Sequence, residues 1–249
     1  MGELYAWIRE VPGTVPVLFL HGVYFDHHLW DWHTERITDH TTIAIDMPLH
    51  GKSGGQAKNG WTLADCSKMV IEILDALNIR EVIAIGHSWG SMSILRAAHD
   101  NPDRFTAVGL CNMPFKAASI RTRILFKMQH LLLGFRTFYT KQVAKALFGR
   151  DTFQADPGLL ALLESSMSRL SGTEIRETDT AVIIHAENTE PLIRSLEVPA
   201  LALRGKEDYV PESAYIRTTT VLGGHVSPAE APEDVFSFIR AVIERQGGI

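Results

Sequence analysis

The fold of this chain is decided by one stretch, Val82-Ile83-Ala84-Ile85-Gly86-His87-Ser88-Trp89-Gly90. Its first four residues are apolar, mostly β-branched and followed by glycine, a pattern typical of a buried parallel strand. Residues 91–98 continue as a helical pattern that stops at Asn101-Pro102. The stretch therefore predicts a strand, a sharp turn and a helix, with Ser88 at the corner. Glycines two residues before and after the serine let strand and helix approach closely, which leaves the serine Oγ raised above the sheet.

A serine in such a turn is a candidate nucleophile, which needs a base and a group that orients the base. Residues 198–205 and 218–222 have strand patterns, and each is followed by one of these groups: Asp208 after the first, His225 after the second. The carboxyl ends of parallel strands form the edge where open sheets place their sites, so we expect both side chains beside the serine. The imidazole would take the serine proton and the aspartate would orient it. Glu207 is an alternative acid, because the sequence does not define the conformation of this loop.

The chain resembles the α/β-hydrolase family, and the resemblance runs nearly from end to end. Besides the serine turn it rests on four motifs in the expected order: residues 17–22 ending in His-Gly, residues 43–53 containing Asp-x-Pro, residues 205–211 around the aspartate, and residues 224–233 beginning Gly-His. The resemblance implies an α/β fold with a mostly parallel sheet of about seven strands, helices on both faces and a helical lid. It also implies an oxyanion hole formed by the backbone N–H groups of Val23 and Trp89.

The chain departs from the family pattern at three places. Leu49 stands where the family usually has glycine. Asp208 and His225 lie 17 positions apart (225 minus 208), where the family usually fits a full helix. Residues 211–217 can form only about two helical turns at 3.6 residues each. A single strand, residues 4–8, precedes the His-Gly strand. We therefore expect a sheet with abridged edges.

Length and composition fit one large domain. The chain has 249 residues, of which 45% are hydrophobic, enough for a sizeable core. We expect residues 1–113 and 191–249 to form the catalytic core and residues 114–190 to form the lid. No apolar run approaches the roughly 18 residues of a membrane span, and the start shows no signal-peptide pattern. Cys66 and Cys111 are expected to be buried thiols, and the expected location is the cytoplasm.

Charge is unevenly distributed along the chain. Residues 114–150 contain eight basic residues and no Asp or Glu, whereas the whole chain has a formal charge of −5; the rest therefore carries −13 (−5 minus 8). The same segment is rich in Phe, Leu and Ile. The simplest interpretation is a lid that packs its apolar face on the core and solvates its charges. Attraction of anionic substrates, or weak contact of the lid with anionic lipid without stable membrane insertion, are the alternatives.

Three further functions, phosphate binding, metal binding and nucleic-acid binding, are not supported by the sequence. Residues 51–53, Gly-Lys-Ser, look like the end of a phosphate-binding loop, but Asp46 occupies the position of its first glycine. His27, His28 and His33 crowd one short loop, yet their aromatic neighbours and the lack of a second ligand cluster favour a loop at the rim of the site over a metal centre. No basic patch interleaved with aromatic residues suggests a nucleic-acid partner. We expect no metal and no organic cofactor.

The combined pattern predicts a serine hydrolase that cleaves a small carboxylic ester or lactone through an acyl-enzyme on Ser88, His225 and Asp208. The expected residues of the substrate pocket are His21, Gly22, His87, Met113 and Pro114. The serine argues against the dehalogenase and epoxide-hydrolase branches, which the resemblance says use aspartate there. Hydrolysis of C–C bonds in diketones, thioester cleavage, cofactor-free peroxidation and a non-catalytic ligand receptor stay open, because fold and triad alone do not separate them.

Overall fold

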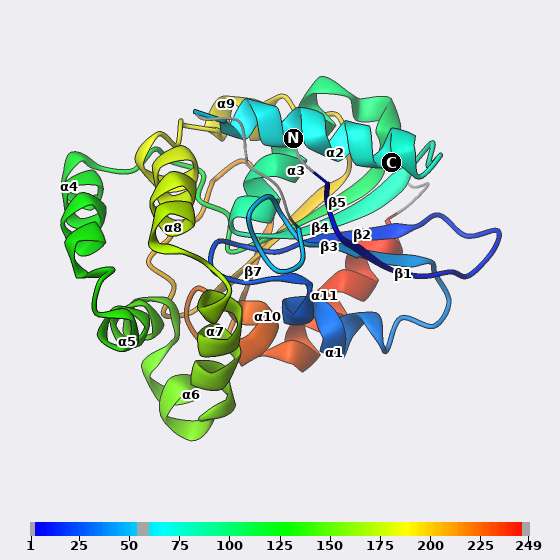
Figure 1. Cartoon of the computed structure of the whole chain (residues 1–249). Helices are drawn as coiled ribbons and strands as arrows, with labels where there is room; N and C mark the ends of the chain where they lie inside the picture. The colour runs from blue at the N-terminus through cyan, green and yellow to red at the C-terminus, as the bar shows by residue number, and fades with distance from the viewer. Residues whose placement is uncertain (1–2, 54–59, 246–249) are drawn as a thin grey trace.

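The computed structural model describes residues 3–53 and 60–245 of the chain, and at its centre lies one β-sheet (Figure 1). The strands are β1 (Ala6–Arg9), β2 (Val17–Leu20), β3 (Thr42–Ile45), β4 (Val82–His87), β5 (Phe105–Cys111), β6 (Ala200–Gly205) and β7 (Thr218–Val221). Within the described residues these seven strands are ordered β1-β3-β2-β4-β5-β6-β7. β1 pairs antiparallel with β3, and all other pairs are parallel. The predicted fold class is confirmed.

Helices cover both faces of this sheet. They are α1 (Asp31–Thr34), α2 (Leu63–Ala76), α3 (Trp89–Asp100), α9 (Glu190–Arg194), α10 (Ser227–Glu230) and α11 (Pro232–Ile243), with short 3₁₀ turns η1 (His27–Trp30) and η2 (Pro102–Arg104). α2, α3 and α9 lie on one face, whereas α1, α10 and α11 lie on the other (Figure 1). Both faces of the parallel strands are therefore shielded from water, as parallel sheets require.

The segment between β5 and β6 is helical and lies to one side of the sheet (Figure 1). Its elements are α4 (Ile120–Gln129), η3 (His130–Leu132), α5 (Arg136–Leu147), α6 (Arg150–Ala155), α7 (Gly158–Ser168), α8 (Gly172–Asp179) and the π-helix η4 (Thr180–Ile184). We call residues 114–190 the helical insertion. Its helices pack on one another, with α5 against α7 and α4 against η4.

Amphipathic spacing explains why the flanking helices form and where they pack. α11 buries Val235, Phe238, Ile239 and Val242, which follow the i, i+3, i+4, i+7 spacing of one helix face. Fully burying each such side chain stabilises the fold by about 1.5–3 kcal/mol. α2 begins at Thr62 with a capping box. Among the described residues no helix is both long and apolar enough to cross a bilayer.

The turn between β4 and α3 has the strained geometry that the glycine spacing predicts. Ser88 has φ 49° and ψ −108°, a conformation that non-glycine residues rarely adopt. A side chain on Gly86 would collide with the backbone of Ser91, and one on Gly90 would collide with the carbonyl of Leu20. The strand and the helix can therefore meet at this corner only without Cβ atoms at both glycines.

The sheet edges differ from the expectation in detail. The first strand is Ala6–Arg9 rather than residues 4–8. Residues 211–217 form turns and no helix, whereas about two helical turns were expected. The whole connection from β6 to β7 covers residues 206–217, and β7 begins beside Ala202, three residues before the end of β6. The chain therefore returns along only part of β6, and residues 211–217 do so without helical structure.

Candidate active site

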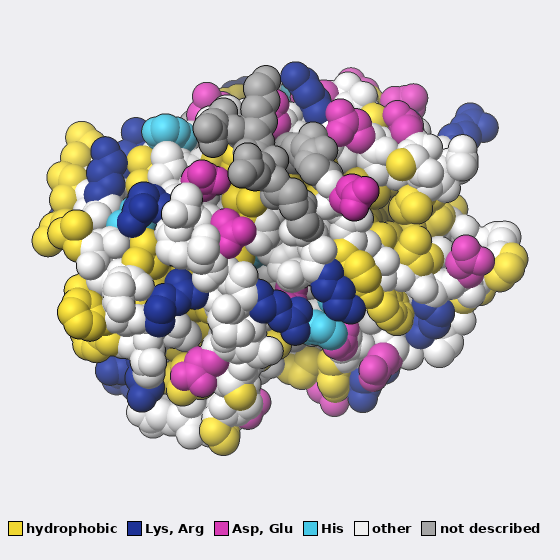
Figure 2. All heavy atoms as spheres, in the orientation of Figure 1, with side chains coloured by type: hydrophobic (Ala, Val, Ile, Leu, Met, Phe, Trp, Pro, Cys, Tyr) yellow, Lys and Arg dark blue, Asp and Glu magenta, His cyan; other side chains and the backbone are white. Residues whose placement is uncertain are grey.

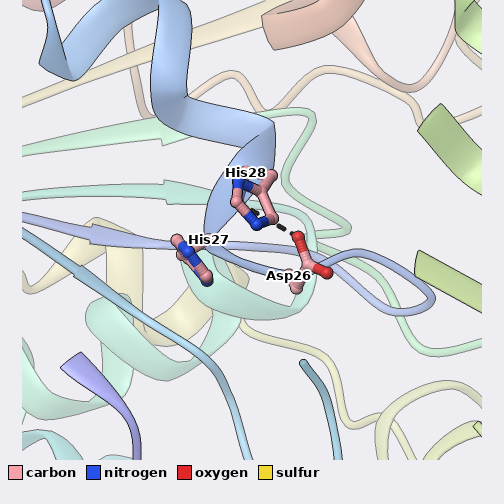
Figure 3. Close-up of side chains that lie close together, drawn as sticks. All are labelled: Asp26, His27 and His28. Carbon is pink, nitrogen blue, oxygen red and sulfur yellow. Dashed lines mark hydrogen bonds between the residues drawn. The ribbon is translucent and has the colours of Figure 1, made fainter. Parts of the chain in front are cut away.

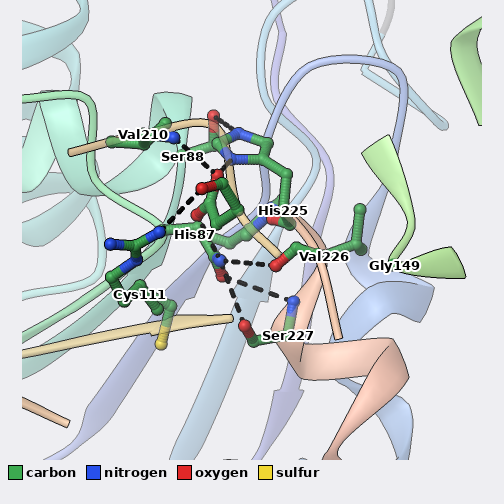
Figure 4. A network of polar contacts seen from close by, with 12 residues as sticks. His87, Ser88, Cys111, Gly149, Val210, His225, Val226 and Ser227 are labelled. Carbon is green, nitrogen blue, oxygen red and sulfur yellow. Dashed lines mark hydrogen bonds and ion pairs between the residues drawn. The ribbon is translucent and has the colours of Figure 1, made fainter. Parts of the chain in front are cut away.

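Ser88, His225 and Asp208 form one hydrogen-bonded row at the carboxyl ends of the strands. Figure 4 shows Ser88 and His225 within this polar network. The serine Oγ lies 2.9 Å from His225 Nε2, and His225 Nδ1 lies 2.9 Å from Asp208 Oδ1. The three residues are buried, although they come from positions far apart in the sequence. The geometry allows a proton to pass from the serine hydroxyl to an imidazole that a carboxylate orients.

The Asp208 carboxylate is held as an anion by donors on both oxygens. Oδ1 accepts the backbone N–H of Val210 at 3.0 Å besides the His225 contact, and Oδ2 accepts Asn112 Nδ2 at 2.8 Å. Burial opposes ionisation, but the His225 ring and these hydrogen bonds outweigh it and hold the pKa of Asp208 below its ordinary value. Glu207, the alternative acid, is exposed and instead accepts the backbone N–H of Arg150.

Asn112, which no sequence motif identifies, ties the acid loop to the histidine loop. Besides Asp208, its Nδ2 donates to the carbonyl of Gly224 at 3.2 Å and to Ser227 Oγ at 3.0 Å. Its backbone has φ 51°, and asparagine tolerates this region better than most residues. The available signal was its position directly after β5, at the same sheet edge as Ser88 and Asp208.

The backbone of His225 is fixed from two sides. Its N–H donates to the carbonyl of Leu147 at 2.6 Å, and its carbonyl accepts His87 Nε2 at 2.7 Å. The ring of Tyr209 stacks on the imidazole with centroids 4.6 Å apart. Since Leu147 belongs to the helical insertion, the histidine is positioned jointly by the core and the insertion.

Glu230 makes a second link between the histidine loop and the insertion. Its carboxylate accepts the backbone N–H groups of Gly224, Val226 and Gly149, the last at 2.6 Å, and also the hydroxyl of Thr152. The sequence placed Glu230 in the histidine motif but gave no sign of this role. The contacts with residues 149 and 152 join parts of the chain about 80 positions apart.

His87 and His21 support this edge from below. Burial, followed by repulsion from His225, lowers the pKa of His87 to about 3, so the ring stays neutral and donates through Nε2. Burial and the nearby His50 lower the pKa of His21 to about 3; its Nδ1 contacts the carbonyl of Gly22 at 2.7 Å, and its Nε2 accepts the N–H of Met47. Neutral imidazoles serve here as buried hydrogen-bonding groups.

The backbone N–H groups of Val23 and Trp89 are available as donors near Ser88. Trp89 is the first residue of α3, where helical N–H groups have no intrahelical partner, and Val23 lines the same cavity as Ser88. Neither N–H has a hydrogen-bond acceptor among the residues that the structure describes. Two unpaired donors beside a serine suit an oxygen that gains negative charge.

The loop that carries Val23 is anchored by a buried polar cluster of Tyr24, Asp179, His130 and Tyr139. Tyr24 has φ 71°, and its hydroxyl donates to Asp179 Oδ1 at 2.7 Å. His130 Nε2 lies 3.0 Å from Asp179 Oδ2, and the Tyr139 hydroxyl lies 3.5 Å from that of Tyr24. Burial raises the pKa of Asp179, although the hydrogen bonds that its carboxylate accepts act in the opposite direction. The cluster joins the loop after β2 to the insertion.

A cavity of about 240 Å³ opens above Ser88. Its wall is mainly apolar, with Met92 from α3, Thr122 and Phe126 from α4, and Val182 and Ile183 from η4. Lys116 is the one charged residue among the described residues of this wall.

Of the five residues predicted to form the substrate pocket, only one lines the cavity. Pro114 lines the cavity as expected, but His21, Gly22, His87 and Met113 are not among its lining residues. They are buried one layer below, where a side chain on Gly22 would lie 2.5 Å from His87 Nδ1. The predicted residues are adjacent in sequence to the site but form its support, because the insertion supplies the wall.

Asp26, His27 and His28 bring potential metal-ligand atoms within 4.8 Å of one another (Figure 3). Hydrogen bonds already account for much of this cluster. His27 Nδ1 lies 2.7 Å from Asp46, His28 Nδ1 lies 2.7 Å from Asp31, and Asp26 caps η1 by accepting the N–H of His28. The expectation of a loop without metal stays a prediction.

His33, the third histidine of that loop, is buried, and burial lowers its pKa to about 3. Arg169 lies 3.4 Å from Asp26 Oδ2, which places a cation where a metal ion would need the same oxygen. Cys66 and Cys111, the two cysteines, are buried and unpaired.

Comparison with known proteins agrees with this architecture. A sequence model of the alpha/beta hydrolase fold matches residues 15–180, and the chain belongs to the α/β-hydrolase fold family. It is 28% identical over 231 residues to a putative non-heme haloperoxidase of Mycobacterium phage D29, covering 86% of this chain and 79% of that protein.

Solved structures show the same fold at low sequence identity. An esterase from Thermogutta terrifontis superposes with a TM-score of 0.81 at 20% identity, over 97% of this chain and 93% of that one. An enol-lactonase from Burkholderia xenovorans LB400 superposes with a TM-score of 0.80 at 21% identity, over 97% and 95% of the two chains.

Proposed function

We propose that the protein is a serine hydrolase that cleaves small carboxylic esters or lactones. The observation that carries the proposal is the row from Ser88 through His225 to Asp208, with both contacts at 2.9 Å and with Ser88 lining a cavity. The esterase and enol-lactonase that share the fold support this substrate class without defining it.

The proposed reaction has two steps. His225 Nε2 takes the proton of Ser88 while Oγ attacks the carbonyl carbon, and the same proton then passes to the leaving alcohol. His225 next activates a water molecule, which releases the acid and restores the serine. The N–H groups of Val23 and Trp89 would stabilise the oxyanion in both steps, each contributing about 3 kcal/mol to lowering the barrier.

The cavity supports a substrate that is small and mostly apolar. A volume of about 240 Å³ beside apolar side chains of α4 and η4 suits a short acyl or alkyl group. We therefore expect esters of short acids to be hydrolysed faster than long-chain esters.

The direct test combines active-site labelling with turnover. A fluorophosphonate should label Ser88, and Ser88→Ala should abolish hydrolysis of p-nitrophenyl acetate and butyrate. Ser93→Ala is the matched control, because Ser93 lies on the same helix and its hydroxyl donates to the backbone carbonyl of Trp89 instead of contacting His225. Folded Ser88→Ala that retains full esterase activity would exclude the mechanism. A wild-type protein that is labelled but turns over no ester, lactone or diketone would favour a ligand receptor.

The haloperoxidase-named relative supports one second candidate, perhydrolysis on the same groups. Here hydrogen peroxide, instead of water, attacks the acyl-enzyme, so an ester and H₂O₂ yield a peracid and an alcohol. The assay is peracid formation from p-nitrophenyl acetate with added peroxide. Peracid in excess of that formed by Ser88→Ala would support this function.

A further inference from the structure

One part of the helical insertion exposes apolar side chains that neither the core nor the cavity explains. We call it the α4–α5 surface: Ile120, Ile124, Leu125, Met128, Leu131, Phe135 and Phe138, each more than half exposed. These are seven of the eleven large apolar side chains that are exposed in the described parts of the chain. Figure 2 shows hydrophobic side chains gathered at the edge where Figure 1 places α4 and α5.

Helix α4 is apolar on two opposite sides. Thr122 and Phe126 line the cavity above Ser88. Ile120, Ile124 and Met128, spaced four residues apart, form a stripe that faces solvent. The first side of α4 forms part of the cavity wall, whereas the second side is exposed to water. No residue of α4 is buried. Exposed apolar side chains gathered in this way mark an interaction surface more often than ordinary protein surface.

The side chains around this apolar surface are cationic. Arg121, Lys127, Lys141 and Lys145 have no carboxylate within 4.0 Å among the residues that the structure describes. The sequence from 114 to 150 supplies no Asp or Glu that could neutralise them. Figure 2 shows Lys and Arg side chains next to the hydrophobic ones on this edge.

We propose that the α4–α5 surface binds the anionic surface of a lipid bilayer. Apolar side chains of the projecting helices would enter the boundary between headgroups and acyl chains, and the lysines and arginines would contact lipid phosphates. A second copy of this chain fits less well, because a two-fold interface would bring two sets of unpaired cations face to face. A nucleic acid would contact the cations but leave the apolar stripe without a partner.

Binding in this way would place the cavity next to the bilayer, since α4 forms part of its wall. The membrane interaction itself does not depend on the proposed hydrolase activity. It can therefore succeed or fail in a test that contains no substrate.

The experiment is co-sedimentation of the full chain with phosphatidylcholine vesicles, with and without about 30 mol% phosphatidylglycerol. We expect binding only with the anionic lipid, at about 50 mM NaCl, and a marked loss at about 300 mM, because salt screens exposed charges. Arg121→Gln with Lys127→Gln should weaken binding about 25-fold, at about fivefold for each charge near the bilayer. Leu131→Ser with Phe135→Ser should weaken it about tenfold or more.

Matched controls separate the surface from general effects. Lys68→Gln with Arg80→Gln removes two exposed charges elsewhere and should leave binding unchanged. Leu222→Ser removes an apolar side chain that is 67% exposed, comparable with Phe135 at 70%, and should also leave it unchanged. Circular dichroism establishes that each variant is folded.

Three results would overturn the proposal. The wild-type protein could fail to bind anionic vesicles at low salt. The surface variants could bind as tightly as their controls. A wild type that ignores vesicles but forms a dimer, lost in Leu131→Ser with Phe135→Ser, would assign the surface to a second copy of the chain.

Discussion

Two adjacent acidic residues, Asp208 and Glu207, have opposite environments. Asp208 is buried against His225 and Asn112, whereas Glu207 is exposed and caps the start of α6 at Arg150. Asp208→Asn should therefore lower kcat for ester hydrolysis by several orders of magnitude, about 10⁴-fold in the best-studied triad. Glu207→Gln should retain most of the activity. Steady-state kinetics on p-nitrophenyl butyrate test this, and the reverse order would move the acid to Glu207.

Asn112 donates to Asp208 through an uncharged amide, and a substitution that adds a charge at this position tests the interaction. Asn112→Asp would replace the Nδ2 donor with a second carboxylate, which repels the charge on Asp208 and raises its pKa. We expect kcat to fall while KM changes little, and the activity to require higher pH. Asn188→Asp, a substitution at an exposed position, is the control. An unchanged pH profile in Asn112→Asp would refute the assigned interaction.

At the scale of elements, the cluster around Asp179 connects α8 and η3 to the loop that carries Val23. Burial raises the pKa of Asp179, so the folded state disfavours its charged form. As the pH rises from the ordinary pKa of an aspartate to the raised value, the carboxyl ionises in the unfolded state but not in the folded state. The free energy of unfolding therefore decreases over this pH window. Below this window the carboxyl is protonated in both states and the loss disappears.

Asp179→Asn keeps the shape and cannot ionise. Its Oδ1 can accept from Tyr24, and its Nδ2 can donate to His130. We expect the melting temperature of this variant, relative to wild type, to increase as the pH rises through that window and then level off. Asp156→Asn, at an exposed position, should show no such trend. A difference in melting temperature that is independent of pH would contradict the raised pKa.

The elements themselves could largely be predicted from the sequence. β4, the serine turn and α3 follow from short-range apolar spacing and paired glycines. The irregular connection over residues 211–217 could not be predicted, because seven residues are enough for about two helical turns and local spacing does not exclude them. Nor could the pocket wall, since α4 and η4 reach the cavity through tertiary packing of the insertion.

Some side chains of the candidate site could be predicted from the sequence, and others could not. Ser88, His225 and Asp208 follow strands, and strand ends in a parallel sheet converge. Asn112, Glu230 and Tyr24 act through hydrogen bonds to positions about 80 to 150 residues away. Local sequence patterns carry no information on such pairs, which explains why the roles of these residues were not predicted.

At the scale of the whole molecule, the insertion and the core carry opposite charge, yet the wall of the cavity is nearly uncharged. If the unpaired cations serve a membrane surface, they should contribute little to reaction with small neutral substrates. We expect kcat/KM for p-nitrophenyl acetate to change by less than about twofold between low and high salt, since neutral substrates are not steered. Arg121→Gln with Lys127→Gln should match wild type in this assay. A strong salt dependence would instead implicate the cations in substrate capture.

The π-helix η4 has a consequence for how the specificity of this chain could change. Its Thr180 carbonyl accepts the N–H of His185, five residues on, so this turn holds one residue more than an α-helical turn. Deleting Ala181 would remove the extra residue and allow an ordinary α-helical turn in place of the wider one. Val182 and Ile183 lie on this turn and line the cavity, so the shape of the cavity wall would change. We therefore expect substrate preference to depend on the number of residues in this turn. It could change here without substitution of a side chain that lines the cavity.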